Sequence, residues 1–227
     1  MKLVAILGSP HGMKGGTGQL LQGVLDGARN GGLDVTTYSL ADLTVRPCDA
    51  CDCCHKIGRC KTKDDFDTLK TAMIEADAIV LASPNYINSV SAQMKAMFDR
   101  CCGALHCQTM GGKYAAAVVT SGGPGSDVVE DYMLRFLRTL GCWTVGSAGC
   151  EARRLQDPAE KATVLQGAAN LGTALAEAAK EKCTFPDQAE ERKAFSERMK
   201  QLITMQKAAW PYEYEYWRQQ GRLQEKG

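Results

Sequence analysis

The chain has 227 residues, of which 44% are hydrophobic and 23% are charged, and its formal net charge is +1. This balance is that of a globular protein with one full-sized core, and it gives no reason to expect a disordered chain or a nucleic-acid partner. No apolar run approaches the ~20 residues of a membrane helix, and the N-terminus lacks a secretory signal, so we expect a cytoplasmic protein with no membrane association.

The N-terminal segment predicts a strand followed by a helix. Residues 3–7 form a continuous apolar run, as in a strand covered on both faces, and the run ends at Gly8. After a glycine-rich loop, apolar residues recur at helical spacing and stop at a pair of glycines, a C-terminal signal for a helix. These positions are Leu20, Leu21, Val24, Leu25 and Ala28, followed by Gly31 and Gly32.

The same alternation of strand and helix repeats along the chain. Further strands are predicted at 35–40, 78–82, 115–120 and 142–148, and further helices at 66–76, 92–101, 128–140 and 158–182. Five strands that alternate with five helices predict an α/β fold, a parallel doubly wound sheet with right-handed crossovers. In such sheets ligands bind at the carboxyl ends of the strands, near the topological switch point.

Three loops at the predicted carboxyl ends carry residues suited to a phosphate and a flat ring. The loop at 9–18 offers hydroxyls and open backbone N–H groups at a helix N-terminus, which favours an anion. It is neither a Walker sequence nor a Gly-x-Gly-x-x-Gly fingerprint, which disfavours ATP and a Rossmann-bound NAD. The loop at 83–91 adds an aromatic residue, and the loop at 120–126 is rich in glycine. Turn formation alone is the alternative for the first and the third loop.

Cysteine is the unusual feature of the composition, with 11 residues. In a chain without a secretion signal, cysteines indicate metal ligation or redox chemistry more than a disulfide scaffold. Five of them are close together, and the pattern C-x2-C-x2-C-x5-C selects Cys48, Cys51, Cys54 and Cys60. Four thiolates from one loop suit a 4Fe-4S cluster or a tetrahedral zinc ion. Cys53 is an alternative ligand to Cys54, and a loop without metal, reduced or disulfide-bonded, is the remaining alternative.

The other cysteines are expected to be core residues, and no histidine is expected to have a catalytic or metal-binding role. His55 is expected to be a surface side chain rather than a ligand. The histidines show no pairing with a nucleophile in the sequence, so a hydrolase has little support. The remaining six cysteines lie in apolar or helical surroundings and are expected to pack as small hydrophobes: Cys101, Cys102, Cys107, Cys142, Cys150 and Cys183.

Several of these segments together resemble the NADPH-dependent FMN reductase and iron–sulfur flavoprotein family. The motifs are Gly8-Ser9-Pro10 with Gly16-Thr17, Ser83-Pro84-Asn85-Tyr86, Ser91-Ala92-Gln93-Met94-Lys95, Phe98-Asp99-Arg100, and Gly112-Lys113 to Gly123. The resemblance spans roughly residues 1–150, with 83–100 the most specific part. Two departures are Gly16, where asparagine is common in the family, and His11, where arginine or lysine is frequent.

The resemblance implies a flavodoxin-like fold with strand order 2-1-3-4-5 and a bound FMN. The first loop is expected to hold the FMN phosphate, and the other two are expected to hold the isoalloxazine ring. The implied FMN-binding residues are Ser9, Gly16, Thr17, Gly18, Pro84, Asn85, Tyr86, Ile87, Thr120 and Gly123.

For the cysteine loop, the resemblance favours a 4Fe-4S cluster over zinc. FMN accepts a hydride as an electron pair and releases electrons singly, whereas a cluster carries one electron at a time. We therefore expect an oxidoreductase that transfers electrons between a carrier, ferredoxin or NAD(P)H, and an unidentified acceptor, and no side chain need act as acid or base. The alternatives are an NAD(P)H-dependent FMN or quinone reductase without a cluster, and a non-enzymatic flavin- or zinc-binding sensor.

The sequence changes character after Pro186. We expect residues 1–185 to form the FMN-binding domain, with the cysteine-rich loop at 47–60, and residues 186–227 to form a C-terminal helical extension. The extension is charge-rich at 188–207 and aromatic at 210–217. Aromatic residues packed this densely are poor solvent-facing residues, which favours packing on a partner subunit in a homo-oligomer, a dimer or a dimer of dimers. Packing on the chain's own domain is the alternative.

Overall fold

The computed structural model describes residues 1–223 and contains a single parallel sheet in that range. The five strands lie in the order β2-β1-β3-β4-β5, and all neighbours are parallel. This confirms the predicted doubly wound sheet and its strand order. The strands are β1 (Lys2–Leu7), β2 (Asp34–Ser39), β3 (Ala78–Pro84), β4 (Tyr114–Ser121) and β5 (Trp143–Glu151).

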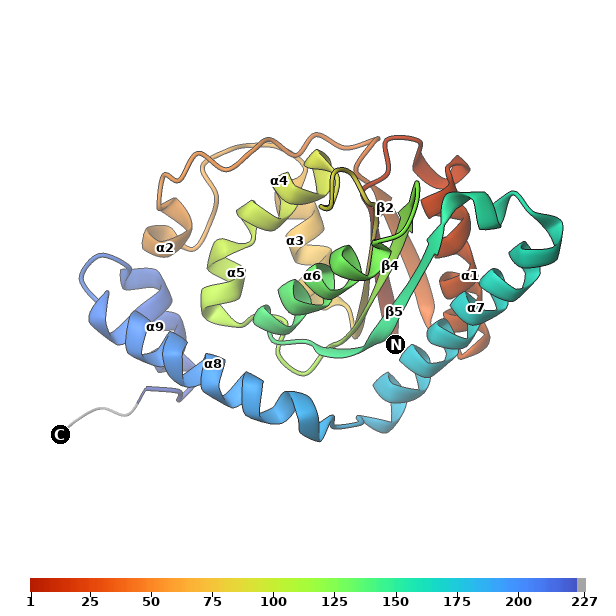
Figure 1. The fold of residues 1–227 in the computed structure, drawn as a ribbon. Coiled ribbons are helices and arrows are strands. Elements are labelled where there is room, and N and C mark those ends of the chain that lie inside the picture. Colours follow the sequence, from red (N-terminus) through yellow and green to blue (C-terminus); the bar gives the residue numbers. More distant parts are fainter. Residues whose placement is uncertain (224–227) are drawn as a thin grey trace.

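Helices cover both faces of the sheet (Figure 1). One face packs on α1 (Gly16–Asn30) and α7 (Pro158–Glu181), and the other packs on α3 (Phe66–Glu75), α4 (Ala92–Arg100) and α6 (Ser126–Thr139). Because both faces are covered, every residue of β3 and β4 is buried, as their apolar sequences require. Two single turns, η1 (Gly12–Lys14) and η2 (Ala152–Leu155), precede α1 and α7.

Helices α1 and α7 touch through their backbones, and glycine makes this possible. A Cβ atom on Gly27 would lie 1.9 Å from the carbonyl oxygen of Ala169, and one on Gly172 would lie 1.9 Å from that of Val24. Larger residues at either position would force the helices apart, so these glycines set the spacing of this layer.

The cysteine loop leaves the carboxyl end of β2 and runs along the upper edge of Figure 1 to the short helix α2 (Cys53–Ile57). A second short helix, α5 (Cys102–Cys107), follows α4 and lies beside α2. Hydrophobic periodicity predicts neither helix. They lie beyond the sheet edge, so the cysteine loop is carried away from the central strands.

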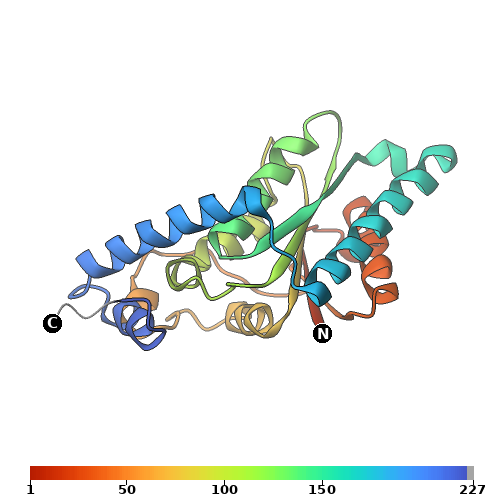
Figure 2. The same cartoon turned by 90° about the horizontal axis from the view of Figure 1, so that it is seen from below.

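The C-terminal extension consists of α8 (Pro186–Met205) and α9 (Pro211–Gln219). Figures 1 and 2 both show α8 running from the end of α7 across the molecule to α9, beside α2 and α5. Trp217 is 1% exposed and packs with Met199 and Ile203, and its indole N–H donates to the carbonyl of His106 at 2.9 Å. Part of the aromatic segment is therefore buried within the chain itself, while the division at residue 185 and packing on a partner subunit stay predictions. No helix in residues 1–223 combines the length and hydrophobicity needed to cross a membrane.

Candidate functional site

The three predicted binding loops meet at the carboxyl edge of the sheet. Hydrogen bonds join the loops directly: the Asn85 backbone N–H donates to the Thr120 carbonyl at 2.7 Å, and the hydroxyls of Thr17 and Thr120 lie 2.6 Å apart. Because Thr17 lies in the first turn of α1 and Thr120 lies next to the last residue of β4, the second contact fixes the start of a helix against the end of a strand. The sheet thus brings the predicted FMN residues to one place, although their contacts to FMN remain predictions.

The first loop presents the N-terminus of α1. Its first turn carries no acidic side chain, and its leading backbone N–H groups have no partner within the helix, which suits an anion. Ser9 is buried at the start of the loop, where its hydroxyl accepts from the His11 backbone N–H at 3.3 Å. A Cβ atom on Gly18 would lie 2.5 Å from the Met13 backbone, so Gly18 is required by the folding of the loop itself.

The second loop contains a tight turn whose tip is exposed. Tyr86 and Ser89 exchange backbone hydrogen bonds, and Ile87 and Asn88 between them have φ values of 52° and 58°. A β-branched residue in the left-handed region costs about 1–3 kcal/mol, and Ile87 is also 99% exposed. A strained, fully exposed apolar residue beside a predicted ligand site is typical of a binding surface.

Open space and an unpaired polar atom lie next to the third loop. Cβ atoms built on Gly122, Gly123 and Gly125 meet no described atom within 4 Å. The Asn85 amide N–H donates to the Gly125 carbonyl at 3.1 Å, but its buried Oδ1 finds no hydrogen-bond partner in residues 1–223. A buried acceptor without a partner is costly. These residues fit FMN: a helix N-terminus for the phosphate, an open surface for the ring, and an acceptor for a ring N–H.

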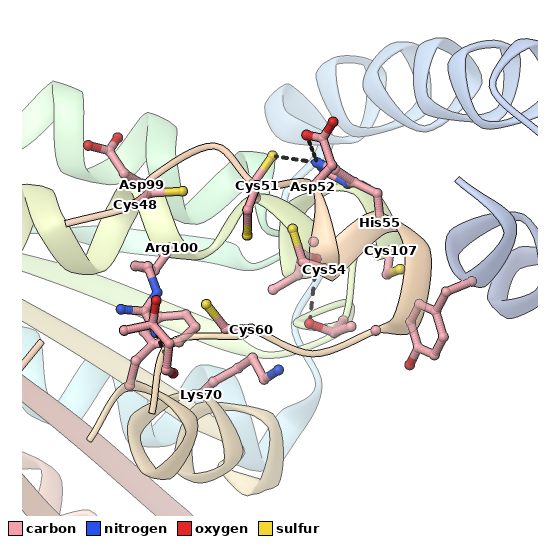
Figure 3. Close-up of a pocket in the computed structure, with 18 of the residues that line it drawn as sticks. Cys48, Cys51, Asp52, Cys54, His55, Cys60, Lys70, Asp99, Arg100 and Cys107 are labelled. Atoms are coloured by element: carbon pink, nitrogen blue, oxygen red, sulfur yellow. Dashed lines mark hydrogen bonds and ion pairs between the residues drawn. The ribbon is translucent and has the colours of Figure 1, made fainter. Parts of the chain in front are cut away.

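The cysteine loop encloses a cavity of about 380 Å³. Cys48, Cys51, Cys54 and Cys60 all line the cavity, and Figure 3 shows their sulfur atoms around the same space. Cys53 is not among the lining residues. Of the two thiols that the sequence left as alternative ligands, only Cys54 therefore faces the cavity.

The loop sulfurs are not gathered as tightly as the ligands of a single ion. Residues 1–223 contain one group of three or more possible metal ligands whose atoms lie within 4.8 Å of one another. None of these four sulfurs belongs to that group. Zinc–sulfur bonds of ~2.3 Å would require sulfurs only ~3.8 Å apart. The four thiols are therefore not gathered as closely as a tetrahedral zinc site requires, whereas a cubane with one thiolate per iron takes ligands that are farther apart.

The base of the loop is closed by a buried ion pair between Arg100 and Asp64. Burial by itself would raise the pKa of Asp64, but hydrogen bonds from Arg100 and from the backbone N–H groups of Arg46 and Phe66 outweigh burial and lower the pKa. Asp64 is therefore held as a carboxylate beneath the cavity. The sequence singled out Phe98-Asp99-Arg100 only as a motif, and the structure gives Arg100 this role.

Histidine and glutamate side chains that the sequence did not assign gather beside the cavity. His55 is 6% exposed, so the expectation of a surface side chain is wrong: its Nδ1 lies 2.6 Å from Glu213 of α9, which is 158 residues away. Glu213 also contacts His106 Nδ1 at 3.0 Å, and both histidines face Cys102. The spacing of Cys102 and His106, four residues apart on one helix, was the available sequence signal.

The surroundings of Cys102 lower the pKa of its thiol. Contacts with His106 and then with His55 lower its pKa to about 6. Contacts with Cys102, Cys54 and Glu213 raise the pKa of His55 to about 12. Burial lowers the pKa of His106, but Cys102 and Glu213 together raise it to about 9. Of the six cysteines expected in the core, Cys102 and Cys183 are only half-buried, and the other four are buried.

Comparisons with known proteins agree with this geometry. Residues 1–152 match the family model of NADPH-dependent FMN reductases. The chain is 34% identical to an iron–sulfur flavoprotein of Archaeoglobus fulgidus, over 97% of this chain and 99% of that protein. The match with that relative therefore includes the cysteine loop and the C-terminal helices as well as the sheet.

Solved structures show the fold at lower identity. A flavone reductase superposes with a TM-score of 0.65 at 17% identity, covering 80% of this chain and 64% of that one. A flavodoxin from the domain Archaea superposes with a TM-score of 0.52 at 19% identity, covering 79% of this chain and 99% of that one. The expectation of a flavodoxin-like fold is confirmed.

Proposed function

The chain belongs to the NADPH-dependent FMN reductase family, and from this membership we propose that it is an iron–sulfur flavoprotein that passes electrons between ferredoxin or NAD(P)H and an acceptor. That it is an FMN-dependent oxidoreductase follows from the family. The cluster, the carrier and the oligomeric state are the proposed part.

One observation carries the proposal of a cluster. Four cysteines in the order C-x2-C-x2-C-x5-C line one cavity, in a chain that is similar over nearly its whole length to an iron–sulfur flavoprotein. Cys48, Cys51, Cys54 and Cys60 would be the ligands of a 4Fe-4S cluster, which carries one electron at a time. Arg100 and Asp64 hold the loop in place, and Phe66 and Ala104 add apolar walls that limit the access of water.

FMN would bind at the carboxyl edge of the sheet, where it supplies the exchange between electron pairs and single electrons. The phosphate would be held by the N-terminus of α1 with Ser9 and Thr17, since these groups are buried donors at a positive helix end. Asn85 would accept a ring N–H through its unpaired Oδ1. Backbone N–H groups near Gly123 would complete the contacts, because no side chain fills that space.

A second subunit is proposed to contact the exposed turn at the FMN site. Ile87 at the tip of this turn is fully exposed and Tyr86 is 45% exposed, so the turn offers apolar surface beside the ring site. Burial of that surface in a homodimer, or a dimer of dimers, would remove apolar side chains from water next to the flavin site. Analytical ultracentrifugation of wild-type protein and Ile87→Asp tests this, because a dissociated variant is expected and an unchanged mass would exclude the turn from the interface.

The function is tested by anaerobic reduction of the purified protein. Reduced ferredoxin, NADPH and NADH are supplied separately while the flavin absorption and the loss of visible cluster absorption are followed. Reduction of both centres by one of these donors is expected. Rapid bleaching of the flavin by NADPH in a protein without iron would instead identify a simple reductase, and absence of flavin reduction by all three donors would contradict an electron-transfer role.

A further inference from the structure

We propose that His55, Cys102 and His106 form a second metal site, whose ligands are separate from the four cysteines of the loop, and that this site binds zinc. Each residue offers one ligand atom, and the three atoms all lie within 4.8 Å of one another. The Cys102 sulfur faces the Nε2 atom of each histidine. None of these atoms belongs to the four cysteines of the motif, although His55 also contacts Cys54 of that motif.

The distances leave room for an ion between the three side chains. The Cys102 sulfur lies 3.9 Å from Nε2 of His55 and 3.9 Å from Nε2 of His106, which is long for a hydrogen bond to either. Zinc bound at ~2.3 Å to sulfur and ~2.05 Å to nitrogen in tetrahedral geometry would hold sulfur and nitrogen ~3.6 Å apart. A change of a few tenths of an ångström would therefore complete the site.

Glu213 orients both histidines as metal ligands. Its side chain is fully buried, and its two oxygens accept from the Nδ1 atoms of His55 and His106 at 2.6 Å and 3.0 Å. A carboxylate that accepts at Nδ1 leaves Nε2 as the ligand nitrogen, and such partners fix the ring and raise its basicity. Glu213 makes this contact to both rings at once, and the two Nε2 atoms are turned toward the same sulfur.

Packing around the site keeps the three ligands in position. Trp210 stacks on both rings, with centroid separations of 4.5 Å to His55 and 5.0 Å to His106. Cys102 and His55 also line the cysteine cavity, which leaves the fourth metal position open to a water molecule from that side. Zinc would link α2 to α5 directly, and Glu213 would link both helices to α9. The metal would therefore stabilise the packing of the C-terminal extension against the wall of the cavity.

The test measures metals in the whole protein, purified without oxygen and supplied with both iron and zinc. Wild-type protein is expected to bind about one zinc ion per chain in addition to iron. His106→Gln is expected to lose the zinc and keep the iron and FMN, while Met205→Ala, at an 82% exposed position on α8 outside both sites, is expected to keep all three. Cys102→Ser serves as a second variant that is expected to lose zinc, should His106→Gln fold poorly.

Zinc-edge X-ray absorption identifies the ligands independently. One sulfur at ~2.3 Å and two imidazole nitrogens at ~2.0 Å are expected. Glu213→Gln is expected to weaken zinc binding by about 10- to 100-fold, measured by competition with a chromophoric chelator, at unchanged iron content. Wild-type protein without zinc, zinc retained in His106→Gln, or a zinc spectrum with four sulfurs would each overturn the proposal, and the last would place zinc in the cysteine loop instead.

Discussion

Arg100 and Asp64 form an ion pair that ties both ends of the cysteine loop to helix α4. The guanidinium donates to the two carboxylate oxygens at 2.9 Å and 3.0 Å, and each side chain is 1% exposed. The same guanidinium donates to the carbonyl of Arg46 before the cysteines and to that of Thr62 after them. The loop is therefore closed at its base by one side chain, which leaves the cysteines between these points free to face the cavity.

Asp64→Asn is expected to destabilise the protein by about 3–5 kcal/mol, because it keeps the shape of the pair but leaves the buried charge of Arg100 unpaired. The free energy of unfolding from denaturant titration measures this. Asp26→Asn, which removes an exposed ion pair on α1, is expected to cost no more than about 1 kcal/mol. An equal effect of the two changes would contradict the structural role of Asp64.

The Asp64 pair also predicts the direction of a pH dependence. The pKa of Asp64 is lowered in the folded protein, so its contribution to stability is present above the unfolded value of ~3.9 and is lost as the pH falls toward the folded value. The difference in stability between wild-type protein and Asp64→Asn is therefore expected to narrow below about pH 4. A difference that stays constant between neutral and acidic pH would show that Asp64 does not titrate in this way.

Gly123→Val is expected to weaken FMN binding without destabilising the fold. A side chain at this position meets no described atom within 4 Å, so it would occupy the space reserved for the ring. A loss of at least about 10-fold in FMN affinity is expected, equivalent to about 1.4 kcal/mol, and fluorescence titration of the apoprotein measures it.

Gly167→Val is the matched control for that experiment. This glycine lies in α7, and a Cβ atom there also meets no described atom within 4 Å. The control is expected to bind FMN as tightly as wild-type protein, with a melting temperature close to that of Gly123→Val. Undiminished FMN affinity in Gly123→Val would remove the third loop from the binding site.

Trp217→Ala is expected to lower the free energy of unfolding by about 3–5 kcal/mol, because it empties a buried volume beside Met199 and Ile203. Met205→Ala, at an 82% exposed position on α8, is expected to change stability by less than about 0.5 kcal/mol. Chemical denaturation of the two variants measures both values. A small effect of Trp217→Ala would show that the extension does not rely on its own chain for its stability.

The sheet was predictable from the sequence because its signals are local. The strands predicted at 78–82 and 115–120 lie inside β3 and β4, since strands buried on both faces must read as continuous apolar runs. The helix predicted at 158–182 ends one residue later than α7, whose proline and Asp157 cap mark the start. Local composition also indicated the four cysteines that share the cavity.

The cluster around Glu213 was not predictable because its contacts are long-range. His55 meets Glu213 across 158 residues, and His55 meets Cys102 across 47. A polar side chain next to a cysteine motif is expected at the surface. His55 is buried because α8 crosses the molecule and places α9 against it. The short helices α2 and α5 were not predicted because neither is long enough to show hydrophobic periodicity.

The central claim is that the four thiols lining the cavity bind a 4Fe-4S cluster, and the pair Cys54→Ser and Cys53→Ser tests it most directly. Iron, sulfide and FMN per chain are measured in both variants and in wild-type protein after anaerobic purification. About four irons and about four sulfides per chain are expected in wild-type protein and in Cys53→Ser, with a marked loss of both in Cys54→Ser at unchanged FMN. A wild-type protein that binds FMN but no iron, or equal iron in the two variants, would contradict the claim.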